Sequence, residues 1–402
     1  MKIKSLKLTD FKGFEELHIE SFGKQTTAII GNNGAGKSSV LEALNIMFYH
    51  LNGRIINIKD SIVNNNSKGQ LASIELESKI GAKVINSKVK ISKTDVLSSF
   101  EDKQQIEIFD SEIQKYKNET GNTYSIVDYP PSRIIIDYSD YDDLERIANS
   151  ALDSRVDFRD FVIWFNRQEN LENEKRLNEN DKFRIRELEA LRKAYRIFFP
   201  GFKKLRIKRG EKSKLIFEND DKILSFNQLS DGEKGVITLI GDIVRRLCSA
   251  NPNLEDPLQG EAIIMIDEIE LHLHPTWQRK IIKKLEAIFP NCQFIITTHS
   301  PQVLSELDAE NDKIIAIKDF KAYEVPTVFG RETNWILETV MDTPARPSEF
   351  KNQLRAYFDL IAQDKLEEAE TLRKKLEAQT GIDEPEFVKA DMLIRRKKAM
   401  KK

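Results

Sequence analysis

The chain has 402 residues, of which 40% are apolar and 32% are charged, and its 63 Lys and Arg nearly balance its 65 Asp and Glu. The net charge of −2 excludes a globally basic nucleic-acid binder, so any such surface must be a local patch. The two cysteines, Cys248 and Cys292, are too few and too far apart for a disulfide framework or a cysteine-rich zinc site. Because the start is not signal-like and no run of about eighteen apolar residues occurs, we expect a soluble, cytoplasmic protein with no membrane partner.

The first fifty residues predict two short strands, then a third strand, a glycine-rich loop and a helix. Apolar and polar residues alternate over 3–19, with a turn at Lys12-Gly13. The apolar run Thr27–Ile30 leads into the loop, and apolar residues at helical spacing follow it over 40–51. This order is the context that a phosphate-binding loop requires.

The loop itself, Gly31-Asn-Asn-Gly-Ala-Gly-Lys-Ser38, has the spacing GxxxxGK[ST]. Glycines let the backbone curl so that its N–H groups face phosphate oxygens, and the helix N-terminus adds positive potential. We expect Lys37 to reach the β- and γ-phosphates and Ser38 to hold Mg²⁺. The alternative, a glycine turn without a ligand, leaves the flanking strand and helix unexplained. The predicted nucleotide-binding residues are Asn32, Asn33, Gly34, Ala35, Gly36, Lys37, Ser38 and Ser39.

The middle of the chain mixes two kinds of pattern. Residues 158–199 are helical and highly charged, and Gly201 closes this segment. Strand alternation returns over 202–217. Before the helical segment, the strand-like stretches are 72–76, 83–85, 89–91 and 132–136.

The rest of the chain alternates between helices and strands and then becomes helical. After Gly232 we predict a helix, a strand over 262–266, a helix over 277–289 and a strand over 293–298, which together indicate a largely parallel sheet in an α/β fold. The tail has two apolar stripes that end at Gly381, typical of an αα-hairpin with a glycine C-cap. A third helix is expected from Pro385.

Three further motifs lie at the start of a predicted helix or at the end of a predicted strand. They carry charged side chains or a glycine with exposed backbone N–H groups. Leu229–Gly235 opens a helix, where Ser230, Gly232 and Glu233 are candidate ligands of an anion. The strand over 262–266 ends in Asp267, a candidate Mg²⁺ ligand, and Glu268, a candidate for polarising the attacking water. The next strand ends near His299, a candidate contact of the γ-phosphate or the water. Alone, each is explained by a helix cap, a solvated strand end or a histidine near a turn; in this order after the loop, chance is a poor explanation.

The order of the four motifs resembles the ABC ATPase superfamily, with Walker A at 31–38, the signature at 229–235, Walker B at 262–268 and the switch His299. The resemblance covers about residues 1–320. Residues 7–14, Asn33 and the wide gap between Walker A and the signature resemble the SMC/RecF/Rad50 branch.

That resemblance implies an α/β P-loop NTPase fold, an ABC ATPase head with mixed sheet lobes. The lobes are expected at 1–157 and 201–335, with a short helical insert at 158–200 and a helical tail at 336–402. It also implies ATP hydrolysis with ATP and Mg²⁺. Members of the superfamily carry a glutamine near Mg²⁺, for which Gln168 is a weak match.

The resemblance further implies a homodimer or higher oligomer. In this superfamily the phosphate loop of one subunit and the signature of another close over the same ATP. The sequence supplies a reason, because one chain carries one of each, and both are anion-binding helix N-termini.

The compact head, the Glu270–Pro275 loop and the helical tail resemble ATPases of bacterial anti-phage loci, of the Septu PtuA type and the retron-associated type, with the PARIS-system ATPase as a rival. Those ATPases pair with an HNH nuclease. Residues 330–402 show no DxD or HNH pattern of their own. Any nuclease activity is therefore expected to come from a partner protein. The alternatives are a RecF-like DNA repair clamp and, less well supported by residues 3–14 and the insert, the ATPase subunit of a transporter.

Some residues leave alternatives open. Lys204, Arg206 and Lys208 share one strand face that suits a double-stranded DNA backbone, with a solvated edge as the alternative. The basic end, 395–402, suits nucleic acid, an acidic partner or a frayed tail. For His272 and His274 we favour interface or capping roles over a metal pair, because no third ligand is evident.

Overall fold

The computed structural model describes residues 1–52, 62–65, 71–92, 99–100, 103–131, 158–209, 214–220 and 222–400. They belong to two compact units, Met1–Ile336 and Leu337–Lys402. The segments predicted at 1–157, 158–200 and 201–335 all fall in the first unit.

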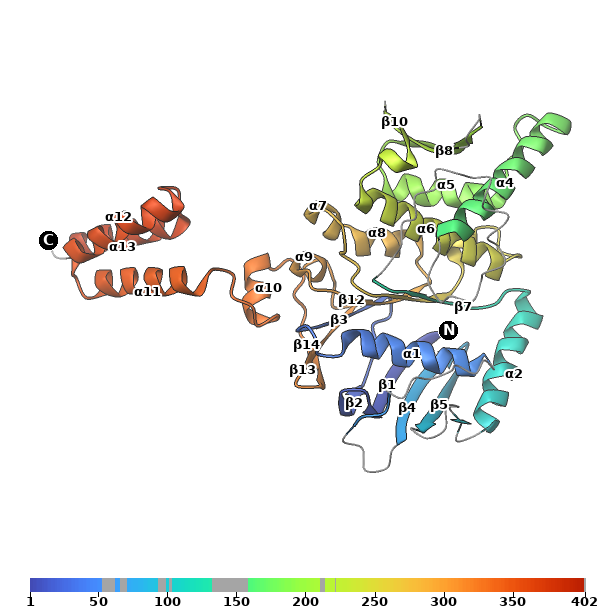
Figure 1. Ribbon diagram of the computed structural model, residues 1–402, viewed down its shortest axis with the longest axis horizontal. Helices are drawn as coiled ribbons and strands as arrows, with labels where there is room; N and C mark the ends of the chain where they lie inside the picture. The colour runs from blue at the N-terminus through green and yellow to red at the C-terminus, as the bar shows by residue number, and fades with distance from the viewer. Residues whose placement is uncertain are drawn as a thin grey trace. The chain divides into compact units, whose positions relative to one another are not determined.

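A six-stranded sheet forms the centre of the first unit (Figure 1). Its five neighbouring strands β13, β3, β12, β11 and β7 run parallel, and β14 pairs antiparallel with β13. Every residue of β11 and β12 is buried, which explains the wholly apolar sequence of β11 and the apolar centre of β12. In sheet order the strands are β14 (Lys321–Val325), β13 (Lys313–Lys318), β3 (Thr26–Gly31), β12 (Gln293–Thr297), β11 (Ala262–Ile266) and β7 (Ser125–Tyr129).

An antiparallel sheet of five strands covers one side of helix α1 (Lys37–Leu51), and the six-stranded sheet covers the other (Figure 1). Side chains of both sheets and of α1 form one core, which is why α1 is buried on nearly all sides. The antiparallel order is β2 (Phe14–Ile19), β1 (Lys2–Phe11), β4 (Leu71–Ile80), β5 (Lys83–Ser92) and β6 (Ser99–Phe100). The turn predicted at Lys12-Gly13 joins β1 and β2, as expected.

The opposite side of the six-stranded sheet carries helices α5, α6 and α8 (Figure 1). The helical segment predicted at 158–199 is α4 (Phe158–Asn178) and α5 (Arg186–Phe198), followed by a small antiparallel sheet. That sheet comprises β8 (Phe202–Lys208), β9 (Lys214–Asn219) and β10 (Lys222–Ser225). The remaining elements here are η3 (Phe226–Gln228), α6 (Asp231–Ala250), η4 (Pro257–Gln259), α7 (Pro275–Gln278), α8 (Ile281–Ile288), α9 (Pro301–Leu304) and α10 (Thr333–Thr339).

Several elements differ from the sequence expectation. The helix expected over 277–289 is split into α7 and α8. The strand expected at 132–136 lies outside the described residues, and the edge strand β7 comes earlier, at 125–129. Strands β13 and β14 and helix α2 (Lys103–Thr120) were not predicted. Helix α2 has a low mean hydropathy and few apolar residues, so its sequence gives little sign of a packed helix.

The second unit is a bundle of α11 (Ser348–Ala362), α12 (Leu366–Thr380) and α13 (Pro385–Met400). The hairpin and the third helix are therefore as predicted, and Gly381 ends α12 with φ 85°. The ammonium of Lys397 donates to the carbonyls of Ile361 and Ala362 at 2.7 and 2.6 Å and caps the C-terminus of α11. Among the helices of both units that the structure describes, none combines the length and apolarity needed to cross a bilayer.

Candidate active site

The glycine-rich loop leaves the end of β3 and enters α1 with its N–H groups free of side-chain caps. Gly36 is the N-cap of α1 at φ 101°, and a Cβ there would lie 2.4 Å from the Phe14 ring. At Gly34, with φ 79°, a Cβ would meet nothing within 4 Å. The loop thus combines left-handed backbone that only glycine adopts cheaply with open space at its tip, as an anion site at a helix N-terminus requires.

Lys37 is held inside this loop, with only 7% of its surface exposed. Its Nζ donates to the carbonyl oxygens of Gly31 and Asn32 at 3.0 and 3.2 Å. Burial lowers the pKa of Lys37, and the negative charges of Asp267, Glu268 and Glu270 oppose that shift. The fold therefore brings the ammonium into the electrostatic reach of carboxylates that lie more than two hundred positions away in the sequence.

Asp267 and Glu268 follow β11 directly, at the carboxyl edge of the parallel strands. The Thr297 hydroxyl, at the end of neighbouring β12, donates to Asp267 Oδ1. The Glu268 N–H donates to the same hydroxyl at 2.8 Å, and Glu268 has a left-handed φ of 48°. A strained backbone of this kind in a non-glycine residue is typical of functional sites.

Asp128 is a further carboxylate at this edge that the sequence analysis missed. It lies on β7 opposite Met265 of β11, and Asn45 of α1 donates to its Oδ2 at 3.0 Å. Burial, followed by the charges of Asp267 and Glu42, raises the pKa of Asp128 to about 6. The available signal is a carboxylate near the end of the short segment Ser125–Tyr129, which the sequence analysis did not predict as a strand.

His299 is half-buried and lies two residues beyond the end of β12. Strand β12 itself lies between β3 and β11 in the sheet. Its N–H donates to Glu270 Oε1 at 2.5 Å, and the Thr298 hydroxyl donates to Glu270 Oε2 at 2.7 Å. Glu270, which the sequence analysis placed only in a loop, is therefore the residue that fixes the backbone of the switch segment.

The signature opens α6. Ser230 is its N-cap and forms a capping box with Glu233, whose carboxylate accepts from the Ser230 N–H at 2.8 Å. A Cβ on Gly232 would lie 2.6 Å from the His272 carbonyl oxygen, so glycine is needed for this contact. Within one chain, no hydrogen bond or ion pair among the described residues joins Ser230, Gly232 or Glu233 to residues 31–39.

The weaker candidates lie elsewhere or have local roles. Gln168 is on α4, next to Glu169, whose carboxylate accepts from the Ile207 N–H of β8. No described contact joins it to the loop of α1, so its place near Mg²⁺ stays a prediction. His274 caps α7, with its Nδ1 accepting from the Thr276 N–H at 3.3 Å. In the part of the chain that the structure describes, no group of three potential metal ligands occurs.

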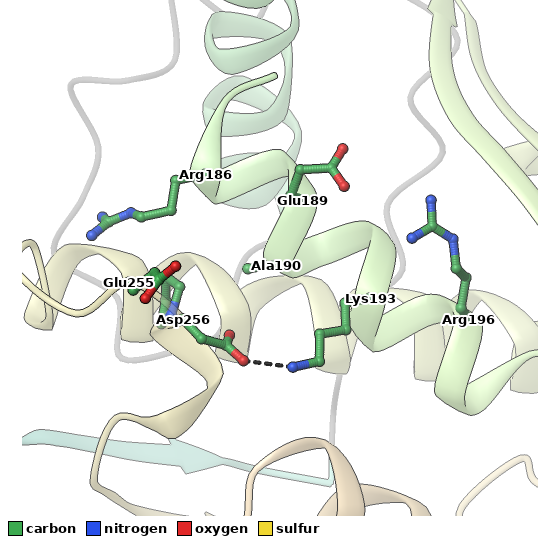
Figure 2. A pocket seen from close by; sticks show the side chains of 8 residues that line it. Arg186, Glu189, Ala190, Lys193, Arg196, Glu255 and Asp256 are labelled. Carbon is green, nitrogen blue, oxygen red and sulfur yellow. Dashed lines mark hydrogen bonds and ion pairs between the residues drawn. The ribbon is translucent and has the colours of Figure 1, made fainter. Parts of the chain in front are cut away.

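A pocket of about 370 Å³ lies apart from these motifs, between α5 and the segment before β11 (Figure 2). Some of its polar groups are already paired, with one another or with residues outside the pocket. Lys193 pairs with Asp256 at 2.6 Å, and the Arg186 guanidinium donates to the Leu254 carbonyl at 2.8 Å. None of its lining residues belongs to the four motifs, so its volume does not mark the active site.

The residues at the sheet edge fit a magnesium–nucleotide complex. A glycine loop at a helix N-terminus that carries no side-chain cap among the described residues suits phosphate oxygens, and Lys37 suits their charge. The hydroxyl of Ser38 and the carboxylate of Asp267 are oxygen donors, the ligands that Mg²⁺ prefers.

Comparisons with known proteins agree with this geometry. Residues 26–305 match the family described as "AAA domain, putative AbiEii toxin, Type IV TA system". The chain is 31% identical to the Retron Vc95 probable ATPase of Vibrio cholerae serotype O1 biovar El Tor, over 89% of this chain and 82% of that protein. It is 24% identical to the Septu protein PtuA of Bacillus thuringiensis, over 95% of this chain and 93% of that protein.

Among solved structures, an Smc head bound to the C-winged helix domain of ScpA matches 81% of this chain and 98% of its own, with 16% identity and a TM-score of 0.50. This likeness concerns the fold. The family match spans well over half of the chain, from β3 through α9. The chain therefore belongs to this AAA-domain family of P-loop ATPases, and its fold is that of an Smc-type ATPase head.

Proposed function

We propose that this protein hydrolyses ATP with Mg²⁺ between two copies of the chain, and that the cycle regulates a nuclease partner in bacterial anti-phage defence. The observation that carries the first part is the gathering of Lys37, Asp267 and Glu268 at the carboxyl edge of one parallel sheet. Family membership and the names of the retron and Septu relatives support the second part.

Each residue has a chemical task in this proposal. Lys37 and the loop N–H groups bind the β- and γ-phosphates, and Glu268 orients and polarises the attacking water. Ser38 and Asp267 hold Mg²⁺, which neutralises charge that develops on the phosphate oxygens. His299 contacts the γ-phosphate. When hydrolysis removes the γ-phosphate, this contact at the end of β12 is lost.

The exposed position of Ser230 in the signature supports a sandwich of two subunits. Ser230 is exposed, is not bonded to the loop of its own chain, and sits at a helix N-terminus that attracts anions. A partner subunit's γ-phosphate is the ligand that would complete this site. ATP bound by two copies in this way forms an isologous pair with two equivalent sites.

Mixing two inactive variants tests the sandwich. Lys37→Ala removes phosphate binding, and Ser230→Arg blocks the signature, so each variant alone is expected to be inactive. A mixed pair contains one site with both defects and one intact site. Because the mixed pair is held by one intact site of two, turnover should return on mixing, up to about half of the wild-type value. A mixture as inactive as its components, measured by phosphate release, would exclude a site shared between subunits.

The partner is expected to dock on the outward side of α13. Arg395, Arg396 and Lys398 are exposed there, beside exposed Met392 and Val388. Lys397 is not part of this surface, because it caps α11. We infer an acidic partner surface from this charge.

A double charge reversal, Arg395→Glu with Arg396→Glu, should abolish co-purification of a nuclease, identified by mass spectrometry, from the native host. ATP turnover should be unchanged. Lys374→Glu with Lys375→Glu, on the exposed side of α12, is the matched control and should retain the partner. Equal recovery with both variants would remove α13 from the interface. ATP-stimulated DNA binding with no nuclease recovered by the wild type would instead favour the RecF-like clamp.

A further inference from the structure

Several hydrogen bonds join the segment after Walker B to the segment after β12, although the two are about thirty residues apart in the sequence. Besides the bonds of Thr297, the carboxylate of Glu270 accepts from the Thr298 hydroxyl at 2.7 Å and from the His299 N–H at 2.5 Å. Each of the two carboxylate oxygens of Glu270 thus accepts a hydrogen bond from one of two successive residues of the switch. A charged acceptor makes these bonds stronger than neutral ones.

A second connection continues from this pair toward α7. The Ser300 hydroxyl donates to Gln278 Oε1 at 2.7 Å, and Gln278 Nε2 donates to the Leu273 carbonyl at 2.9 Å. The loop between Glu270 and α7 is also closed on itself, because the Leu273 N–H donates to the Glu270 carbonyl at 2.9 Å. The switch and this loop are therefore held together at both ends.

The same loop touches the signature helix. The His272 carbonyl lies so close to Gly232 that a Cβ would come within 2.6 Å of it, and His272 has a left-handed φ of 63°. Because there is no free space between the loop and Gly232, a movement of the loop toward α6 would have to move the helix as well. Close-packed contacts of this kind transmit small shifts.

We propose that Glu270 is the positioning residue of the switch histidine, and that it couples His299 to the signature Gly232 of the same subunit through the loop 271–274. Glu270 touches no substrate in this assignment and acts through the Thr298 hydroxyl and the His299 backbone N–H. The coupling step rests on the proposed function: in the sandwich, His299 faces one ATP and Gly232 of the same chain faces the other. The state of one γ-phosphate is thereby passed to the neighbouring site.

Glu270 also lies within electrostatic reach of Lys37, so a competing role is to tune that ammonium. The two roles predict different kinetics. Loss of Lys37 tuning weakens nucleotide binding and raises KM. Loss of His299 positioning leaves KM unchanged and lowers kcat, because a misplaced group costs up to about a hundredfold in rate.

The experiment is a double-variant cycle on the full chain. Glu270→Ala is expected to lower kcat severalfold to a hundredfold with KM for ATP within about twofold of wild type, and Glu270→Gln to lose less. Glu270→Ala added to His299→Ala should cause little further loss, since both remove the same positioned group. Glu310→Gln, an exposed glutamate after α9, is the matched control and should behave as wild type. A raised KM with unchanged kcat, or multiplicative losses in the double variant, overturns the positioning role.

Cooperativity of turnover with ATP concentration tests the coupling. The wild type should give a Hill coefficient above one, and Glu270→Gln, whose fold is checked by its unchanged thermal unfolding, should give a lower value. A wild-type value of one, or equal values for both proteins, overturns the coupling. The double-variant cycle reads residues of one chain only, so it remains decisive even if mixing Lys37→Ala with Ser230→Arg restores no activity and the sandwich itself is wrong.

Discussion

Replacing Glu268 with Gln is expected to stop ATP turnover while leaving ATP trapped between two subunits. The substitution keeps the size of the side chain and removes the charge that polarises water, a contribution of about 10²- to 10⁴-fold in rate. Binding should persist, because the loop around Lys37 is untouched. Light scattering with Mg·ATP should then show a species of twice the chain mass of 46.4 kDa.

The control for this trap is Lys37→Ala, which lacks the phosphate ligand and should stay monomeric under the same conditions. A Glu268→Gln protein that remains monomeric with saturating Mg·ATP would contradict the sandwich. One that retains more than about a tenth of wild-type kcat would show instead that Glu268 is not the group that activates water.

Asp242→Ala should destabilise the folded protein by about 3 kcal/mol, because it removes a buried carboxylate that accepts from two half-buried arginines and from the buried Tyr129 hydroxyl. Asp242 has no exposed surface, and its Oδ1 accepts from Arg245 at 2.7 Å. Its Oδ2 accepts from Arg246 Nε at 2.7 Å and from the Tyr129 hydroxyl at 2.9 Å. The network joins the signature helix α6 to β7, where the Tyr129 carbonyl accepts from the Asp267 N–H at 2.9 Å.

Urea unfolding measures this effect as a fall in the transition midpoint. The matched control is Asp160→Ala, which removes an exposed carboxylate 3.8 Å from the same Arg245 and should cost less than about 1 kcal/mol. Equal losses for both variants would show that burial of the network adds nothing.

The pH dependence of the Asp242 network has a defined sign. Burial alone would raise the pKa of Asp242, but Arg246 and Arg245 outweigh it and hold the pKa below its ordinary value of 3.8. Its stabilisation is therefore present above that value and is lost as the pH falls through the lower pKa of the folded state.

The candidate active site is marked by local sequence features, which is why it can be predicted from the sequence. Glycine at positions 31, 34 and 36 has a conformational meaning that few other residues share, and the strand before it and the helix after it are strongly periodic. The Asp267-Glu268 pair can likewise be recognised from the sequence, because it directly follows the apolar run of a buried strand. The signature is also legible, because Ser230 and Glu233 form a capping box within four residues.

The tertiary structure alone decided which distant residues meet at that site. Asp128 approaches Asp267 only through the register of β7 on β11, and Glu270 reaches His299 only because β11 and β12 are neighbours. Neither pairing has a sequence signal, since strands separated by more than a helix can be ordered in many ways within a sheet. Motifs with their own backbone geometry can be recognised from sequence, whereas contacts set by strand order and register require the folded chain.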